Sequence, residues 1–123
     1  MNFFQRRKIL KNANYLDLTP ICTKEHLIGT DKKVVVIIPK FTNKFAVQSI
    51  VPKLKYPDMK LNLDEIGSEV WLAIDGRKKV KEIAVELSQR FGDKIQPIDE
   101  RLTKFLTQLY EQRLITFDEI KGA

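Results

Sequence analysis

Apolar residues recur at helical spacing in the second half of the chain, first between residues 63 and 76. Asp64 precedes the apolar face, which begins at Ile66, and can accept hydrogen bonds from the first free amides of a helix. Asp75 and Gly76 follow it, and glycine readily adopts the left-handed conformation that ends a helix. The pattern therefore predicts a capped helix between Asp64 and Gly76. Its apolar face consists of Ile66, Val70, Trp71 and Ile74.

Two further helices are predicted by the same period. One covers residues 80–91 and stops at Gly92, and the other follows Pro97 over about residues 98–112. The apolar positions are Val80, Ile83, Ala84, Leu87 and Phe91 in the former and Ile98, Leu102, Phe105, Leu106 and Leu109 in the latter. Each set forms one stripe, so both helices are expected to pack one face against a core.

The first half of the chain has β-strand patterns instead. Val34–Ile38 is an unbroken run of β-branched residues, and Gly29 and Asp31 in the preceding turn favour a hairpin. The predicted extended segments are residues 15–22, 24–28, 33–38, 59–63 and 114–117. Strands followed by three helices predict an α+β fold, with a small three-stranded antiparallel sheet packed on three helices. This arrangement is similar to a winged helix-turn-helix.

Length and composition predict one domain over residues 15–120, preceded by a basic tail at residues 1–14. The net charge of +6 is uneven, since residues 1–61 hold 12 Lys or Arg against 4 Asp or Glu, and residues 62–123 hold 10 against 12. A basic half is compatible with nucleic acid, an anionic membrane surface or an acidic partner. It is equally compatible with a solvated, lysine-rich surface.

Two basic segments leave alternatives open. The inserted segment at about residues 40–58 interleaves lysines with aromatic residues, which can bind phosphate and stack bases or simply pack a loop. A turn or two of helix around Phe45–Val51, halted by Pro52, is expected inside it. Residues Met1–Lys11 could form a short amphipathic helix in peripheral contact with a membrane, or a docked tail.

The sequence shows no motif for catalysis, for a cofactor or for a metal. Neither a phosphate-binding loop, a dinucleotide fingerprint, a zinc pattern nor a nucleophile elbow occurs. His26 has no neighbouring ligands, and Cys22, the single cysteine, is expected to fill apolar space. We therefore expect a non-enzymatic binding protein that needs no cofactor. The absence of a secretory signal and of a long apolar run predicts a cytoplasmic location.

Two binding modes fit such a fold. A DNA reader would insert its last helix into the major groove, yet residues 99–113 carry three acidic and three basic residues and are neutral overall. A peptide binder would instead pair an extended segment with a free strand edge. Residues Met59–Leu63 are the candidate edge, and the helix over residues 98–112 is the candidate wall of a groove beside it.

The chain resembles the PqqD family, the small chaperone-like proteins of pyrroloquinoline quinone biosynthesis. The resemblance covers about residues 59–117 and rests on the stretches LDEIGSEVWLAIDG, VKEIAVEL and RLTKFLTQLYEQRLITF. Two positions depart from the family pattern. Lys79 stands where the family usually has a capping Thr, and Arg113 replaces the usual Gly before Leu-Ile.

The resemblance implies a winged-helix-like domain that binds the leader segment of a precursor peptide as an added strand. It also implies presentation of that peptide to a modifying enzyme, often a radical-SAM enzyme. Carried onto this chain, the candidate peptide-binding residues are Met59, Lys60, Leu61, Asn62, Leu63, Arg101, Lys104, Phe105 and Gln108. The alternatives are a winged-helix nucleic-acid binder or a membrane-surface accessory protein. The oligomeric state does not follow from the sequence.

Overall fold

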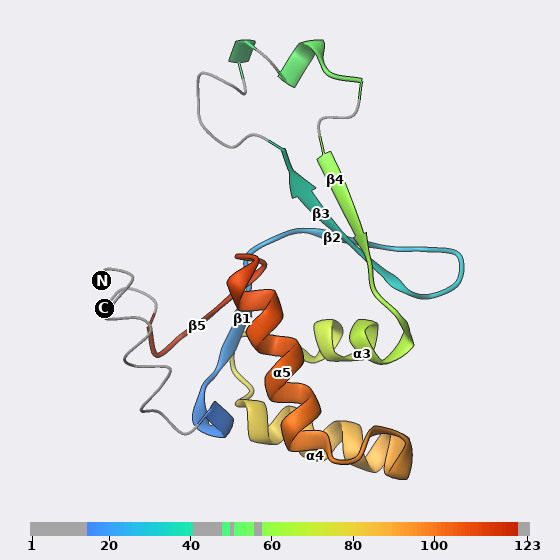
Figure 1. Cartoon of the computed structure of the whole chain (residues 1–123), viewed down its shortest axis with the longest axis vertical. Coiled ribbons are helices and arrows are strands. Elements are labelled where there is room, and N and C mark those ends of the chain that lie inside the picture. Colours follow the sequence, from blue (N-terminus) through green and yellow to red (C-terminus); the bar gives the residue numbers. More distant parts are fainter. Residues whose placement is uncertain (1–14, 41–47, 50, 56–57, 121–123) are drawn as a thin grey trace. The chain divides into compact units, whose positions relative to one another are not determined.

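The computed structural model describes residues 15–40, 48–49, 51–55 and 58–120. The described residues divide into two compact units, one within residues 24–68 and the other made of residues 15–23 with 69–120 (Figure 1). The predicted single domain over residues 15–120 stays a prediction. Most of the segment expected to be helical around Phe45–Val51 lies outside the described residues, and a short 3-10 helix, η2, covers Val51–Lys53 and includes Pro52.

The first unit is built on a three-stranded antiparallel sheet. Its strands are β2 (His26–Ile28), β3 (Val34–Pro39) and β4 (Asp58–Asn62), in the order β2-β3-β4. Val36 of the central strand β3 pairs with His26 of β2 on one side and with Leu61 of β4 on the other. Val34 and Val36 are fully buried, as expected from the β-branched run. The predicted hairpin and third strand are confirmed, with β4 one residue earlier than expected.

A buried hydroxyl connects this sheet to helix α3 (Glu65–Ala73). The Val34 N–H donates to Ser68 Oγ at 2.8 Å, and Ser68 Oγ lies 3.4 Å from the Leu63 carbonyl oxygen that it faces. Ser68 is 2% exposed, so its hydroxyl satisfies two backbone groups that would otherwise be buried without partners. The predicted cap is also confirmed, because the Gly67 N–H donates to Asp64 Oδ1 at 2.7 Å.

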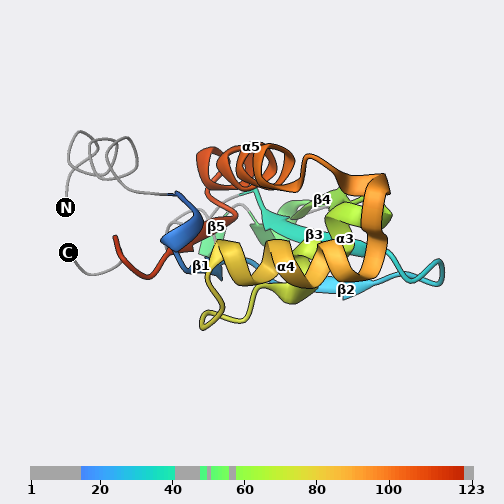
Figure 2. The same cartoon turned by 90° about the horizontal axis from the view of Figure 1, so that it is seen from below.

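The second unit contains the helices α4 (Val80–Phe91) and α5 (Ile98–Glu111), which pack against one another (Figure 2). Gly92 has a φ of 60° and ends α4, as the sequence predicted. The predicted end of the first helix at Gly76 is too late, because α3 ends at Ala73 and Gly76, with a φ of 79°, lies in the connection to α4. The buried residues of the two helices are Val80, Ile83, Ala84, Leu87, Leu102, Leu106 and Leu109. The helical periods therefore identified the core face of both helices.

A second, two-stranded sheet joins the beginning and the end of the described chain. Strand β1 (Pro20–Cys22) pairs antiparallel with β5 (Ile115–Phe117), with Pro20 opposite Phe117. The sequence predicted both extended segments but not their pairing. Next to this pair of strands, the N–H and the hydroxyl of Thr19 donate to the Glu119 carboxylate at 2.6 and 2.9 Å. The Val80 N–H at the start of α4 donates to the Leu18 carbonyl.

The extended conformation predicted from residue 15 is wrong for its first three residues. Tyr15–Asp17 form a 3-10 turn, η1, in which the Leu18 N–H donates to the Tyr15 carbonyl. This turn places the Tyr15 ring edge-on against Phe117, with 5.3 Å between the ring centroids. The aromatic contact stabilises this turn, which the neighbouring residues in the sequence do not predict.

The described residues confirm an α+β fold with three helices and a three-stranded antiparallel sheet. The winged helix-turn-helix arrangement stays a prediction. Among the described residues, none of the helices combines the length and the apolar character that crossing a membrane requires.

Candidate functional site

Among the residues that the structure describes, strand β4 is an edge of the three-stranded sheet and pairs with β3. The Leu63 N–H donates to the Val34 carbonyl at 2.9 Å, and on the other side the Ile37 N–H donates to the Glu25 carbonyl. Backbone groups of successive residues in an antiparallel strand point to opposite sides. Since the odd-numbered residue Leu63 bonds to β3, the N–H and C=O groups of Lys60 and Asn62 point away from it. No strand that the structure describes pairs with these outward groups.

The side chains of this edge divide between the two faces of the sheet. Met59 and Leu61 share the face of the buried Val36, while Lys60 and Asn62 lie on the opposite face. Met59 is 51% exposed, and Lys60 and Asn62 are exposed. Leu63 directly after the strand is only 7% exposed, so its side chain belongs to the core and only its neighbours are available for binding.

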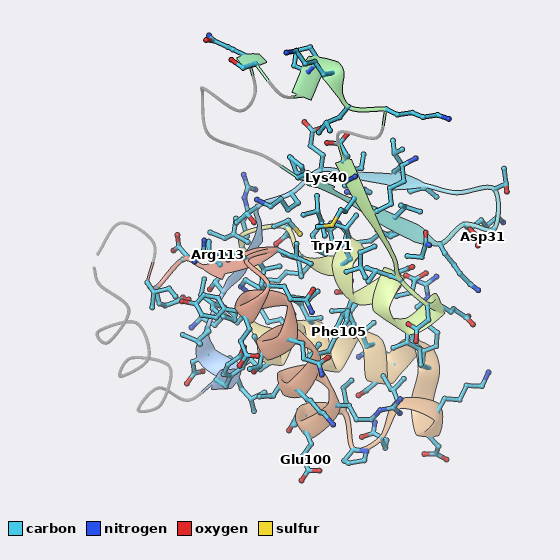
Figure 3. The ribbon with its side chains drawn as sticks, turned by 45° about the horizontal axis from the view of Figure 1, so that its top comes forward. Asp31, Lys40, Trp71, Glu100, Phe105 and Arg113 are labelled. Atoms are coloured by element: carbon cyan, nitrogen blue, oxygen red, sulfur yellow. The ribbon has the colours of Figure 1, made fainter. Side chains whose placement is uncertain are left out.

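The four helix residues predicted for the site share one stripe of α5. Arg101, Lys104, Phe105 and Gln108 follow the spacing i, i+3, i+4, i+7, which places them along one side of a helix. Phe105 is half-buried midway along α5, between Glu100 near its start and Arg113 beyond its end (Figure 3). The Arg101 guanidinium donates to the Lys94 carbonyl at 2.9 Å, so this side chain already holds the turn before α5.

The structure thus brings Met59–Asn62 together on one strand edge and Arg101–Gln108 together on one helix face. The strand belongs to the unit of residues 24–68 and the helix belongs to the other unit. That the two sets line a single groove stays a prediction.

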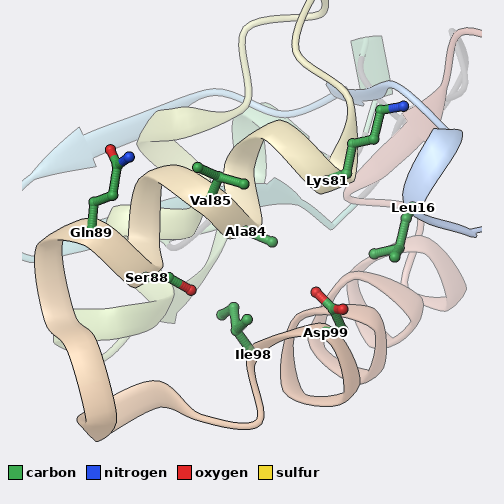
Figure 4. Close-up of a pocket in the computed structure, with 8 residues that line it drawn as sticks. All are labelled: Leu16, Lys81, Ala84, Val85, Ser88, Gln89, Ile98 and Asp99. Atoms are coloured by element: carbon green, nitrogen blue, oxygen red, sulfur yellow. The ribbon is translucent and has the colours of Figure 1, made fainter.

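The helical unit also contains an open groove of about 440 Å³ that the sequence did not predict (Figure 4). Its lining residues include the aliphatic side chains Leu16, Ala84, Val85 and Ile98. Lys81 also lines the groove and forms an ion pair with Asp17, with 3.1 Å between Nζ and Oδ1. Val85 is 57% exposed on α4 and lies outside the buried stripe of that helix. An apolar residue outside the stripe is the sequence feature that could have indicated the groove.

Burial changes the pKa of two side chains, those of Cys22 and Tyr15. Burial raises the pKa of the Cys22 thiol to about 11, which keeps it protonated and weakly nucleophilic at neutral pH. Burial also raises the pKa of Tyr15 to about 12, and the Tyr15 and Thr107 hydroxyls lie 3.2 Å apart in a hydrogen bond. In the described part of the chain, no group of three or more His, Cys, Asp and Glu could hold a metal ion.

The comparison with known families matches residues 55–115 to the model of PqqD, coenzyme PQQ synthesis protein D. The matched region begins just before β4, includes α3, α4 and α5, and ends at the first residue of β5. It therefore contains the strand edge and the helix stripe described above. No curated protein and no solved structure matches the chain.

Proposed function

Residues 55–115 make this chain PqqD-like, and from this premise we propose that it is a non-catalytic adaptor for a precursor peptide. In this proposal it binds the leader segment of the peptide and presents it to a modifying enzyme, of which a radical-SAM enzyme is the kind that the family resemblance implies. The observation that carries the proposal is the free edge of β4, with the backbone groups of Lys60 and Asn62 pointing outward.

Binding by strand addition divides affinity and specificity between two kinds of contact. The outward N–H and C=O groups of Lys60 and Asn62 bond to the backbone of any extended segment, whatever its sequence. Side chains beside the added strand then select among segments. In the proposal, Met59 and Leu61 contact its side chains on one face, and Arg101, Lys104, Phe105 and Gln108 are further candidate contacts.

The proposed adaptor would act by ordering its peptide before the enzyme meets it. Fixing one residue's backbone costs about 1–2 kcal/mol, so a disordered precursor loses considerable entropy when it docks in an active site. An adaptor that holds the leader as a strand bears part of that cost and raises the local concentration of the segment to be modified. No reactive side chain is required for this role.

The proposal is tested with Asn62→Pro. Proline removes the outward Asn62 N–H, which β3 does not use, and its ring obstructs an added strand. We expect a labelled leader segment of a PqqD-type precursor peptide to bind at least 10-fold more weakly by fluorescence anisotropy, because backbone bonds carry the affinity. The thermal unfolding midpoint should change little.

The matched control is Ile28→Pro on β2, the opposite edge of the same sheet. The Ile28 backbone likewise points away from β3, because the Gly29 N–H donates to the Lys33 carbonyl at the adjacent position. This variant should bind the leader peptide normally. Failure of the native chain to bind the peptide, or undiminished binding by a folded Asn62→Pro variant, would rule out the adaptor.

A further inference from the structure

We infer that the β4 edge selects extended segments in which an acidic residue stands between two apolar residues. The inference rests on the proposed function, since it names the chemistry of the segment that the edge would accept. It follows from the register of the sheet and from the charge and exposure of three adjacent residues, Met59, Lys60 and Leu61.

The first step concerns which side chains meet. A residue paired directly opposite another across two strands has its side chain on the same face of the sheet. A residue opposite Lys60 would therefore lie on the Lys60 face, and its two neighbours would lie on the face of Met59 and Leu61. This alternation holds for a parallel and for an antiparallel partner, so the predicted three-residue pattern does not depend on the direction of binding.

The second step concerns the charge at Lys60. Its side chain is exposed and makes no ion pair with any residue that the structure describes, and across the sheet it faces the aliphatic Ile37. Asp58 on the same face is two residues away, roughly 7 Å along the strand. Residues 24–68 hold 8 Lys against 5 Asp or Glu, so the local charge favours an anion.

The third step concerns the flanking positions. Met59 is 51% exposed and Leu61 is half-buried, opposite Ile38 and Val36. An added strand with apolar residues at both positions would cover this apolar surface, and a flexible methionine can adapt to side chains of different shape. Polar residues at those positions would instead lose water without gaining a partner. The edge thus combines one cationic position with two apolar positions.

The test uses three labelled 12-residue peptides that differ only at the centre, Val-Glu-Val, Val-Gln-Val and Val-Lys-Val, in an otherwise uncharged host. We expect the glutamate peptide to bind the full chain about 3- to 10-fold more tightly than the lysine peptide, because opposite charges across a strand pair attract and like charges repel. Lys60→Glu should reverse this order, and Lys60→Gln should abolish it.

Lys53→Glu is the matched control, since it makes the same change of charge at an exposed residue of η2. It should keep the native order of the three peptides. Equal binding of all three, with loss of binding in Asn62→Pro, would overturn the inference and leave the adaptor intact. Absence of binding by any of them, together with no effect of Asn62→Pro on the leader peptide, would overturn both.

Discussion

The turn that ends α5 uses an arginine in a conformation that favours glycine. Arg113 has φ of 64°, in the left-handed region, and the turn is closed by hydrogen bonds from the Arg113 N–H to the Tyr110 carbonyl and from the Leu114 N–H to the Leu109 carbonyl, both at 2.9 Å. This is the Schellman arrangement, whose left-handed residue is usually glycine because a Cβ is disfavoured there. The family departure noted at this position therefore has a structural cost.

Arg113→Gly should stabilise the chain by about 0.5–1 kcal/mol, because it removes the unfavourable left-handed Cβ, which outweighs the extra freedom of glycine in the unfolded chain. Chemical denaturation of the two proteins measures the difference. Arg113→Ala removes the charge and keeps the Cβ, so it should lie within about 0.5 kcal/mol of the native chain. A glycine variant no more stable than the alanine variant would contradict the explanation.

At the scale of elements, the two helices α3 and α4 begin differently. Asp64 caps α3 through its carboxylate. Lys79 precedes α4 in an extended conformation and makes no side-chain cap, since an ammonium group has no lone pair with which to accept an amide. The reverse contact, from the Lys79 N–H to Glu82 Oε1, is long at 3.5 Å. A positive charge at this end of a helix is also opposed by its dipole.

Lys79→Thr should therefore stabilise the chain by about 1 kcal/mol, because the threonine hydroxyl can accept an amide of the first turn and pair with Glu82 as a capping box. Thermal and chemical unfolding report the gain. Lys79→Ala serves as the control, because it removes the charge without adding an acceptor and should gain less. Equal stability of the two variants would show that the hydroxyl does not cap α4.

The charge of Lys60 opposes pairing of the β4 edge with another copy of itself. An antiparallel self-pair centred on Lys60 would place two ammonium groups opposite each other, which is unfavourable. Lysine on an edge strand is a common protection of this kind. The same charge that opposes self-pairing favours an acidic segment, so one residue can serve both purposes.

At the scale of the whole molecule, the basic character is not placed on the helix that a winged-helix DNA reader would use. Asp99 and Glu100 are exposed in the first turn of α5, and Arg101 is engaged by the Lys94 carbonyl. The surplus of basic residues lies before residue 62 instead. Residues Met1–Lys11, the proposed membrane contact, lie outside the described residues.

We expect the full chain to bind a 24-base-pair DNA duplex no more tightly than about 1 μM at 150 mM salt, the range of non-specific electrostatic association. Fluorescence anisotropy at several salt concentrations checks this. Replacing Arg101 and Lys104 by alanine should leave the weak association unchanged, because α5 is not expected to contact phosphates. Nanomolar binding that this double variant abolishes would instead support the nucleic-acid alternative.

Local signals in the sequence located most helix ends, the exception being α3, which ends at Ala73 rather than at Gly76. Asp64 accepts an amide from the first turn of α3, and Gly92 ends α4 with the positive φ that glycine readily adopts. The apolar periods also identified the core faces of α4 and α5, and the alternation at residues 59–63 indicated the third strand. These features depend on residues a few positions apart, which is why sequence alone predicts them.

Only the tertiary structure decided the contacts between residues distant in the chain. The pairing of Pro20 with Phe117, the Ser68 hydroxyl beneath Val34 and the hydrogen bond from Arg101 to Lys94 each depend on where another element lies. The outward direction of the Lys60 and Asn62 backbone likewise follows from the register against β3. A shift of one residue would exchange the paired and the free groups, and no local pattern specifies that choice.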